Sequence, residues 1–147
     1  MSAEEGKFYR LRCVANKNYL SSVVSAVSDS DSQERFEISS SDGAEAMFMY
    51  DGESLLSYTE GLYANTHAFT AVGAQKSSVV FTAAANGAIG QYNITVGGRY
   101  IYGQGNTKNN HVDSGASSPT ATNTSGYNWW LEEVTTLPVT ITAARYA

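Results

Sequence analysis

Apolar and polar residues alternate over short stretches along most of the chain. Between residues 8 and 13, Tyr9, Leu11 and Cys13 alternate with arginines, and the turn-forming stretch 15–18 separates them from a second short apolar stretch. A period of two predicts β-strands. No segment longer than about eight residues carries the periodicity of a helix. The pattern therefore predicts an all-β protein built from many short strands.

Three stretches of this pattern are versions of one another. They begin at Phe8, Met47 and Gln91, and each leads through small polar residues to an apolar, aromatic closing strand at 35–38, 79–82 or 128–131. The spacing leaves room for about four short strands in each unit. Internal repeats of this kind predict a β-trefoil with three pseudo-symmetric units, with an up-and-down barrel or a sandwich as alternatives.

The closing strands also predict part of the core. In a strand, Trp129 and Leu131 point to one face and Trp130 points to the other. We expect Trp130 to face outwards, towards a partner, a neighbouring loop or the segment that follows. The same alternation in the other units gives the predicted core residues, which are Phe36, Ile38, Phe81, Trp129 and Leu131.

The composition of the chain excludes several classes of function and partner. The chain has 147 residues, enough for one domain, with 16% charged residues and a formal net charge of -5. It has no cluster of Lys and Arg, which argues against nucleic acid or an anionic membrane as the main partner. No apolar run approaches the ~20 residues that span a bilayer. Cys13 is the only cysteine, so no internal disulfide forms, and a buried, inert thiol is expected.

The third unit is the richest in side chains that bind sugars. An aromatic ring can stack on the apolar face of a sugar while Asp, Asn, Gln or His side chains bond its hydroxyls. The alternative is that the amide-rich loops satisfy their own turns and that half of the tyrosines belong to the core. The predicted sugar-binding residues are Tyr102, Gln104, Asn106, His111, Asp113, Asn123 and Tyr127.

The first and second units contain fewer candidate binding residues. Tyr63 shares its repeat position with Tyr19 and Tyr100, which favours a structural role. Asp29 and Asp31 resemble a fragment of a calcium loop, but the invariant glycine and the distal glutamate are missing, so a solvated loop is expected. We predict no metal site and no cofactor.

Catalysis has little support in the sequence. None of the usual hydrolase, metalloprotease or phosphate-binding motifs is present, and the histidines are only two, His67 and His111. Glycosidases need two carboxylates across a cleft. Glu132 and Glu133 are adjacent on a strand and therefore face opposite sides, so a noncatalytic protein is expected. Asn93 and Asn123 each begin a sequence that matches the N-glycosylation signal.

Residues 8–12, 18–21 and 36–38 resemble the "YRI … GKYLS … F/W-x-I" layout of ricin-type β-trefoil lectin repeats. The resemblance covers nearly the whole chain and implies a trefoil fold and sugar binding. Ricin-type repeats close with Gln-x-Trp, whereas the tryptophan position is here Phe36, Phe81 or Trp129. The acidic residue that receives sugar hydroxyls has no match in the first two units, and Asp113 is an approximate equivalent in the third.

Residues 129–141 resemble a "W-x-L-E-E-V-x-x-L-P-V-x-I" junction of large secreted or surface proteins of gut Bacteroidetes, which are often glycan-degrading enzymes. The resemblance implies that 135–147 form a linker or the start of a neighbouring domain. The alternative is a C-terminal strand or tail of the same domain. Residues 1–7 then form an N-terminal lead or cloning remnant, and 8–134 form the trefoil.

The expected function is that of a noncatalytic carbohydrate-binding module attached to a larger secreted or cell-surface glycan-processing protein. Its partners would be a glycan or polysaccharide and a neighbouring domain of the same chain. The alternative is a structural or protein-interaction trefoil that packs against its neighbour through Trp130 and the C-terminal strand. A trefoil protease inhibitor is a weaker reading, because such inhibitors often staple their loop with disulfides.

Overall fold

A computed structural model describes residues 3–26, 34–59, 61, 63–64, 69–70, 76–104, 111–115, 118–120 and 126–137. The first strands are β1 (Phe8–Cys13), β2 (Tyr19–Ala26), β3 (Glu34–Ser39) and β4 (Phe48–Tyr50), with a short 3-10 helix, η1 (Ala44–Ala46), before β4. The middle of the chain forms β5 (Leu55–Ser57), β6 (Tyr63–Ala64), β7 (Phe69–Thr70) and β8 (Val79–Ala83). The last strands are β9 (Gln91–Val96), β10 (Arg99–Gln104), β11 (His111–Gly115) and β12 (Trp129–Val134).

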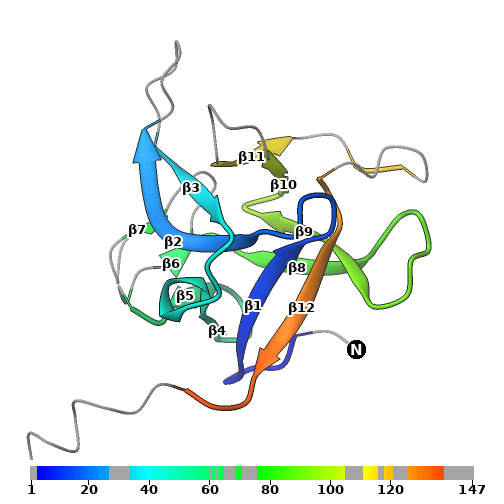
Figure 1. Ribbon diagram of the computed structural model, residues 1–147. Helices are drawn as coiled ribbons and strands as arrows, with labels where there is room; N and C mark the ends of the chain where they lie inside the picture. Colours follow the sequence, from blue (N-terminus) through cyan, green and yellow to red (C-terminus); the bar gives the residue numbers. More distant parts are fainter. Residues whose placement is uncertain are drawn as a thin grey trace, which may run out of the picture.

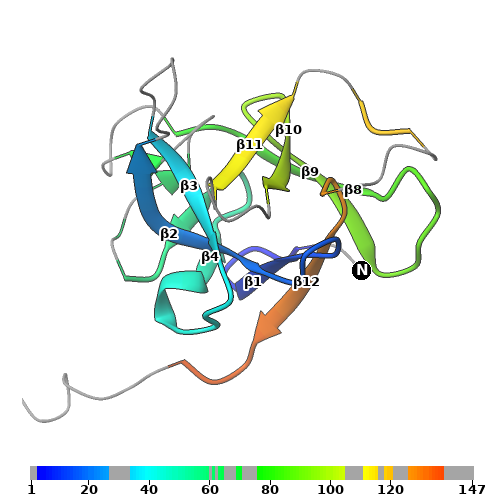
Figure 2. The same ribbon diagram turned by 45° about the horizontal axis from the view of Figure 1, so that its top comes forward.

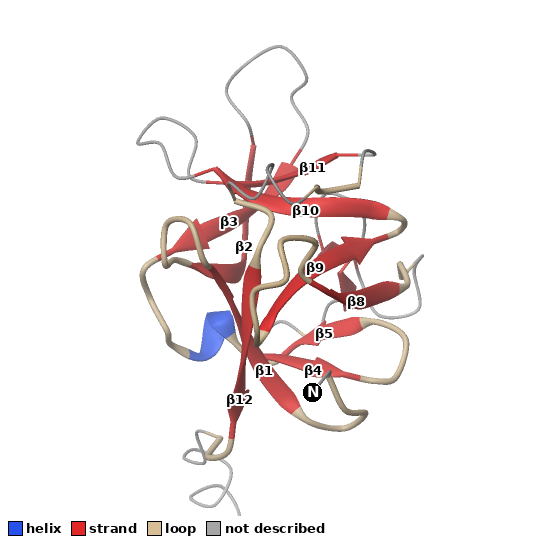
Figure 3. Cartoon of the chain, turned by 90° about the vertical axis from the view of Figure 1, so that its right-hand side faces the viewer, coloured by secondary structure: helices blue, strands red, loops and turns tan. Residues whose placement is uncertain are grey.

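The strands are arranged as a barrel with three hairpin caps, which confirms the predicted β-trefoil. Strand β1 pairs with both β12 and β4, β4 pairs with β5, β8 pairs with β9, and β9 pairs with β12, all antiparallel. These strands form the barrel (Figure 1). Three hairpins, β2–β3, β6–β7 and β10–β11, form the caps. The caps of the first and third units lie side by side (Figures 2 and 3), and β11 pairs there with β3.

The boundaries of the units differ from those predicted. The predicted second opener is β4, and it pairs with β1, so it closes the first unit instead of starting the second. The predicted first closer lies in β3, which forms the cap hairpin with β2. The second unit starts at β5. Every barrel strand has a similar apolar, aromatic pattern, because each sends alternate residues into the same core, so the pattern does not distinguish an opening strand from a closing one.

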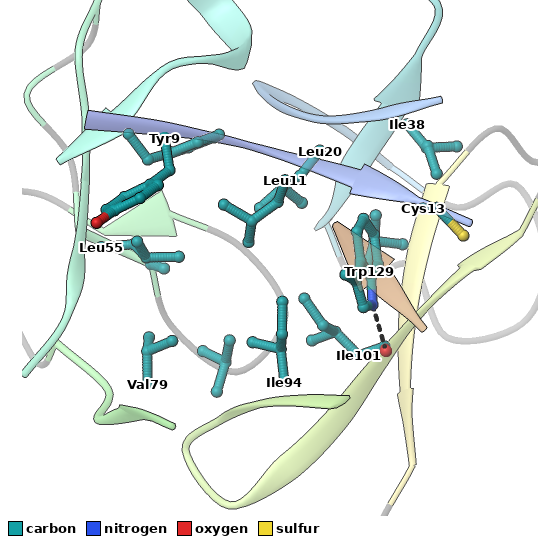
Figure 4. Packing of buried hydrophobic residues seen from close by; sticks show 14 residues of the cluster. Tyr9, Leu11, Cys13, Leu20, Ile38, Leu55, Val79, Ile94, Ile101 and Trp129 are labelled. Carbon is teal, nitrogen blue, oxygen red and sulfur yellow. Dashed lines mark hydrogen bonds between the residues drawn. The ribbon is translucent and has the colours of Figure 1, made fainter. Parts of the chain in front are cut away.

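The core lies inside the barrel and beneath the caps (Figure 4). Of the predicted core residues, Ile38 and Trp129 are buried, which confirms them. Phe81 and Leu131 are only partly buried and pack against the core from its edge. The side chain of Phe36 lies outside what the structure describes. The largest fully buried side chains include two more aromatic residues from barrel strands, Tyr9 and Phe48.

Cys13 also belongs to the core, as expected. It is a free, buried cysteine. Burial raises the pKa of its thiol, because the charged thiolate is disfavoured away from water. The thiol is therefore protonated and unreactive at neutral pH.

Trp130 lies on the other face of β12, half-buried, and it has a neighbour within the domain. The guanidinium carbon of Arg12 lies 5.8 Å from the centre of the Trp130 ring and 5.2 Å from that of Tyr19. Arg12 also lies 3.7 Å from a carboxylate oxygen of Glu132. Trp130 is thus partly covered by a cation from the adjacent strand β1.

The residues before β1 contact the barrel. The backbone N–H of Gly6 donates to the carbonyl oxygen of Tyr50 at 2.7 Å. The Tyr9 hydroxyl accepts a hydrogen bond from the backbone N–H of Glu4 at 2.8 Å, and Ala3 packs against the core. Strand β12 ends at Val134, and residues 138–147 lie outside the described part, so the division of the chain into lead, trefoil and linker stays a prediction.

Candidate functional site

The cap hairpin of the third unit carries four of the seven predicted sugar-binding residues. The turn at 97–98 reverses the chain with two glycines at positive φ, and β10 follows it. Antiparallel pairing sets Tyr102 opposite Asp113 and Gln104 opposite His111. The side chains of the last three lie outside what the structure describes, as do Asn106 and Asn123 entirely, so their roles stay predictions.

Tyr127 joins this hairpin from the segment that precedes β12. The rings of Tyr102 and Tyr127 lie with their centres 4.9 Å apart and their planes at 41°. Both residues are half-buried. Rings at this separation attract each other beyond the area that they bury. The structure therefore brings two predicted site residues from different segments into one aromatic pair.

A close backbone contact between two glycines places the two rings together. The backbone N–H of Gly103 donates to the carbonyl oxygen of Gly126 at 3.0 Å. A Cβ atom on Gly126 would lie 2.9 Å from the carbonyl oxygen of Gly103, and Gly126 has φ +79°. A Cβ atom on Gly103 would lie 2.7 Å from Cδ1 of Ile38 and 2.9 Å from Sγ of Cys13. Only glycine fits at either position without displacement of its neighbours.

The indole of Trp129, in the core, holds the backbone of β10 near Tyr102. Its Nε1–H donates to the carbonyl oxygen of Ile101 at 3.1 Å, inside the core (Figure 4). This bond satisfies a buried indole donor and a carbonyl of β10 at once. The thiol of Cys13 lies 3.6 Å from the carbonyl oxygen of Gly126. The backbone around Tyr102 and Tyr127 is therefore held from two directions.

A buried amide network fixes the backbone of Tyr127. The side-chain nitrogen of Asn93 donates to the carbonyl oxygen of Tyr127 at 3.0 Å and to Oδ1 of Asn128 at 2.8 Å. Asn128 in turn donates to Gln91 at 2.9 Å and to Asn86 at 3.1 Å. Asn93 and Asn128 are each 3% exposed. The Asn93 nitrogen is therefore enclosed, and the folded chain does not present it for glycosylation.

The scaffold formed by Gly103, Gly126 and the amides of Asn93 and Asn128 was not predicted from the sequence. Asn93 gave one signal, because it is a polar residue in a strand otherwise suited to the core. Gly103 and Gly126 gave none that set them apart from the other glycines of turns and loops. Their role follows from contacts between segments that are distant in sequence.

The tyrosines that share a repeat position each contact a neighbouring side chain, and a structural role for Tyr63 stays a prediction. Tyr19, Tyr63 and Tyr100 lie near the start of β2, β6 and β10. The guanidinium of Arg12 covers the Tyr19 ring, and the ammonium of Lys76 lies 4.9 Å from the centre of the Tyr63 ring. The hydroxyl of Tyr100 accepts a hydrogen bond from Ser118 at 3.4 Å.

The two adjacent carboxylates of β12 do not form a catalytic pair. Glu132 lies 3.7 Å from Arg12, and Glu133 lies 3.3 Å from Lys7, so each is bound to a different cation on or just before β1. In the part of the chain that the structure describes, no group of three or more His, Cys, Asp or Glu side chains could hold a metal ion. The described residues also include no helix long and apolar enough to cross a membrane.

Comparisons with known proteins relate the chain to others by fold. No protein-family model matches it, and no curated protein matches it in sequence. Among solved structures, a ricin B-like lectin of Macrolepiota procera in complex with lactose is similar, with a TM-score of 0.63, 12% identity, and coverage of 91% of this chain and 100% of the lectin. The designed threefold-symmetric protein ThreeFoil has a TM-score of 0.60 and 12% identity, with 86% and 99% of the two chains covered.

A third similar structure is a salivary protein of Culex quiquefasciatus from the Cysteine and Tryptophan-Rich family. Its TM-score is 0.61 at 15% identity, over 91% of this chain and 99% of that one. At these identities the similarity shows the fold alone. Together with the barrel and its three hairpin caps, it shows that the chain is a β-trefoil domain whose structural neighbours include ricin B-like lectins.

Proposed function

We propose that the chain is a noncatalytic carbohydrate-binding domain and that its site lies in the third unit. The observation that carries the proposal is the half-buried aromatic pair Tyr102–Tyr127 beside the β10–β11 hairpin. The lectin that shares the fold is in complex with lactose. This supports a sugar as the ligand of the trefoil, although the two sequences are too different to transfer its binding residues.

The proposed site combines a rigid aromatic surface with polar groups. The tyrosine pair provides a platform for the apolar face of a sugar ring, and its position is fixed by the glycine contact and the amide network. Asp113, which is paired with Tyr102, is the proposed acceptor of sugar hydroxyls. Gln104, Asn106, His111 and Asn123 are proposed to complete the hydrogen bonds.

We further propose that the domain belongs to a larger secreted or cell-surface glycan-processing protein. The resemblance of residues 129–141 to a domain junction supports this. A shallow site gives weak affinity by itself. Tethering to a catalytic domain would raise the effective concentration of the glycan and compensate for that weakness.

Glycan arrays followed by isothermal titration test the proposal, with lactose and with plant, host and bacterial polysaccharides. We expect Tyr102→Ala and Tyr127→Ala to weaken binding about tenfold each, which corresponds to about 1.4 kcal/mol. Tyr58→Ala is the matched control, because it removes a tyrosine from an aromatic pair elsewhere, with Phe8 at 5.6 Å. A folded, monodisperse protein that binds none of these glycans contradicts the proposal.

One observation favours a second candidate function, a protein-interaction trefoil. Ile89 is 99% exposed, and it lies two residues before Gln91, which pairs with the outward-facing Trp130. Tryptophan is enriched among the residues that contribute most of the binding energy at protein contacts. If this surface packs on a neighbouring domain, a longer chain should melt several degrees higher, and Trp130→Ala together with Ile89→Ser should abolish that gain.

A further inference from the structure

The barrel has a seam between β5 and β8. Strand β8 pairs with β9 along its whole length, from Val79 opposite Val96 to Ala83 opposite Tyr92. Within the described residues no ladder joins the other edge of β8 to β5. Two hydrogen bonds bridge the two sides near the start of both strands. The backbone N–H of Val79 donates to the carbonyl oxygen of Glu53 at 2.7 Å, and the hydroxyl of Ser54 donates to the carbonyl oxygen of Ser77 at 2.6 Å.

The backbone of β8 presents hydrogen-bonding groups to this seam. Alternate residues of an antiparallel strand direct their N–H and C=O groups to opposite neighbours. Ser78 and Ala84 bond to the β9 side, whereas Val79 donates away from it. Phe81 and Ala83 therefore direct their backbone groups into the seam. Neither has a backbone partner on that side among the described residues.

A hollow of about 320 Å³ adjoins this edge. The rings of Tyr50 and Phe81 meet edge to face within its lining, with centres 5.5 Å apart. Val80, which precedes Phe81 in β8, is 51% exposed. The hollow thus offers a receptacle that is part aromatic and part polar beside an open strand edge. Its lining residues are Ala3, Tyr50, Gly52, Glu53, Ser78, Val79, Val80 and Phe81.

The rim of the hollow is acidic. The side chain of Glu53 is 62% exposed, and the carboxyl carbon of Glu5 lies within 3.3 Å of the position that a Cβ on Gly52 would take. Lys76 is the nearby cation, 3.3 Å from Asp51 and 3.6 Å from Glu53. The Lys76 ammonium pairs with two carboxylates, and Glu5 adds a third beside Gly52, so the described part of the rim keeps a negative charge that attracts a cation.

We propose that this seam binds an extended segment of a partner protein that carries an apolar side chain flanked by basic ones. The segment would pair with Phe81 and Ala83 as an added strand, place its apolar side chain in the hollow beside Tyr50, and set a basic side chain near Glu53. Main-chain hydrogen bonds give such complexes their affinity, and the pocket and the charge give specificity. The inference does not depend on sugar binding in the third unit.

The test uses the full ¹⁵N-labelled chain and an acetylated, amidated peptide, Lys-Thr-Val-Thr-Leu-Thr-Val-Lys. We expect saturable shifts of the Phe81 and Ala83 amide signals with a Kd below about 1 mM. N-methylation of alternate peptide amides should weaken binding at least about tenfold, because it removes the donors of one edge. Replacing both lysines by glutamate, or Glu53→Gln in the protein, should weaken it about threefold or more.

Val23→Ser is the matched protein control, because Val23 is an exposed apolar residue outside the hollow. It should leave the Kd unchanged. Equal binding by the N-methylated peptide overturns the proposal, as do shifts confined to another surface or no binding at about 1 mM peptide. Strong protection of the Phe81 amide from hydrogen exchange in the free chain also overturns it, because the chain itself would then occupy the edge.

Discussion

The substitution Gly126→Ala tests the backbone contact that holds Tyr127 beside Tyr102. The new methyl group would sit on a residue with φ +79° and lie 2.9 Å from the carbonyl oxygen of Gly103. The left-handed conformation costs a non-glycine residue about 1–2 kcal/mol. Displacement of the rigid Gly103 carbonyl would also weaken the hydrogen bond between the two glycines, worth about 0.5–1.5 kcal/mol. We therefore expect a loss of about 2–3 kcal/mol in the free energy of unfolding.

Urea unfolding, followed by the fluorescence of the buried Trp129, measures this loss. Gly87→Ala and Gly90→Ala are the controls, since both have a similar positive φ, +77° and +78°, and neither would bring a Cβ atom within 4 Å of another group. They report the conformational cost alone. If Gly126→Ala destabilises the protein no more than these two, the close contact does not constrain the fold and the reasoning is wrong.

Two further predictions concern titratable groups. Burial alone would raise the pKa of Asp51, but hydrogen bonds from the backbone N–H groups of Ser54 and Glu53 outweigh it and the pKa is lowered. A carboxyl group whose pKa is lower in the folded state than in the unfolded state stabilises the fold at pH values above the unfolded-state pKa. This stabilisation is lost as the pH falls through the folded-state pKa. Asp51→Asn should therefore cost about 1 kcal/mol at pH 7, and urea unfolding should show this difference vanish as the pH falls below 3.8, the ordinary value. A difference that persists at about pH 2 would contradict the argument. Cys13, whose pKa burial raises, should react with a thiol reagent only as fast as the protein unfolds, so prompt labelling of the native protein would refute its burial.

The class of the fold was predictable because its signals are local. Alternation with a period of two shows strands, and the repetition of aromatic strands shows threefold order. The same local signals explain why Trp129 and Ile38 were correctly assigned to the core. They also explain the error over the unit boundaries, since β4 has the pattern of any barrel strand. Its pairing with β1 is a contact across the chain that alternation does not encode.

The turn before β5 illustrates a smaller limit. The dipeptide Asp51-Gly52 is one of the strongest signals in the chain for a two-residue turn, but Tyr50 pairs with Leu55, which leaves a loop of four residues. The Asp51 carboxylate accepts hydrogen bonds from the backbone N–H groups of the third and fourth loop residues at 2.9 and 2.7 Å, and these bonds define the longer loop. Side chains that bond their own backbone can thus select a turn that dipeptide preferences do not predict.

The location of the candidate site in the third unit stays a prediction. The supply of aromatic and amide side chains favours that unit, and the structure sets Tyr102 opposite Asp113 in the β10–β11 hairpin. That Tyr127 joins Tyr102 depends on Gly103, Gly126 and the amide of Asn93, which act across distant segments. Sequence spacing carries no information on such packing.

The pairing of β11 with β3 divides the pseudo-symmetric domain into unequal parts. Strands β2, β3, β11 and β10 form one continuous four-stranded sheet that spans the first and third units. An isolated hairpin is only marginally stable, so two joined caps support each other. Among the described residues, the β6–β7 cap of the second unit has only β5 as a further neighbour. The first and third caps should therefore open and close as one cooperative unit, while the second can unfold locally at lower free energy.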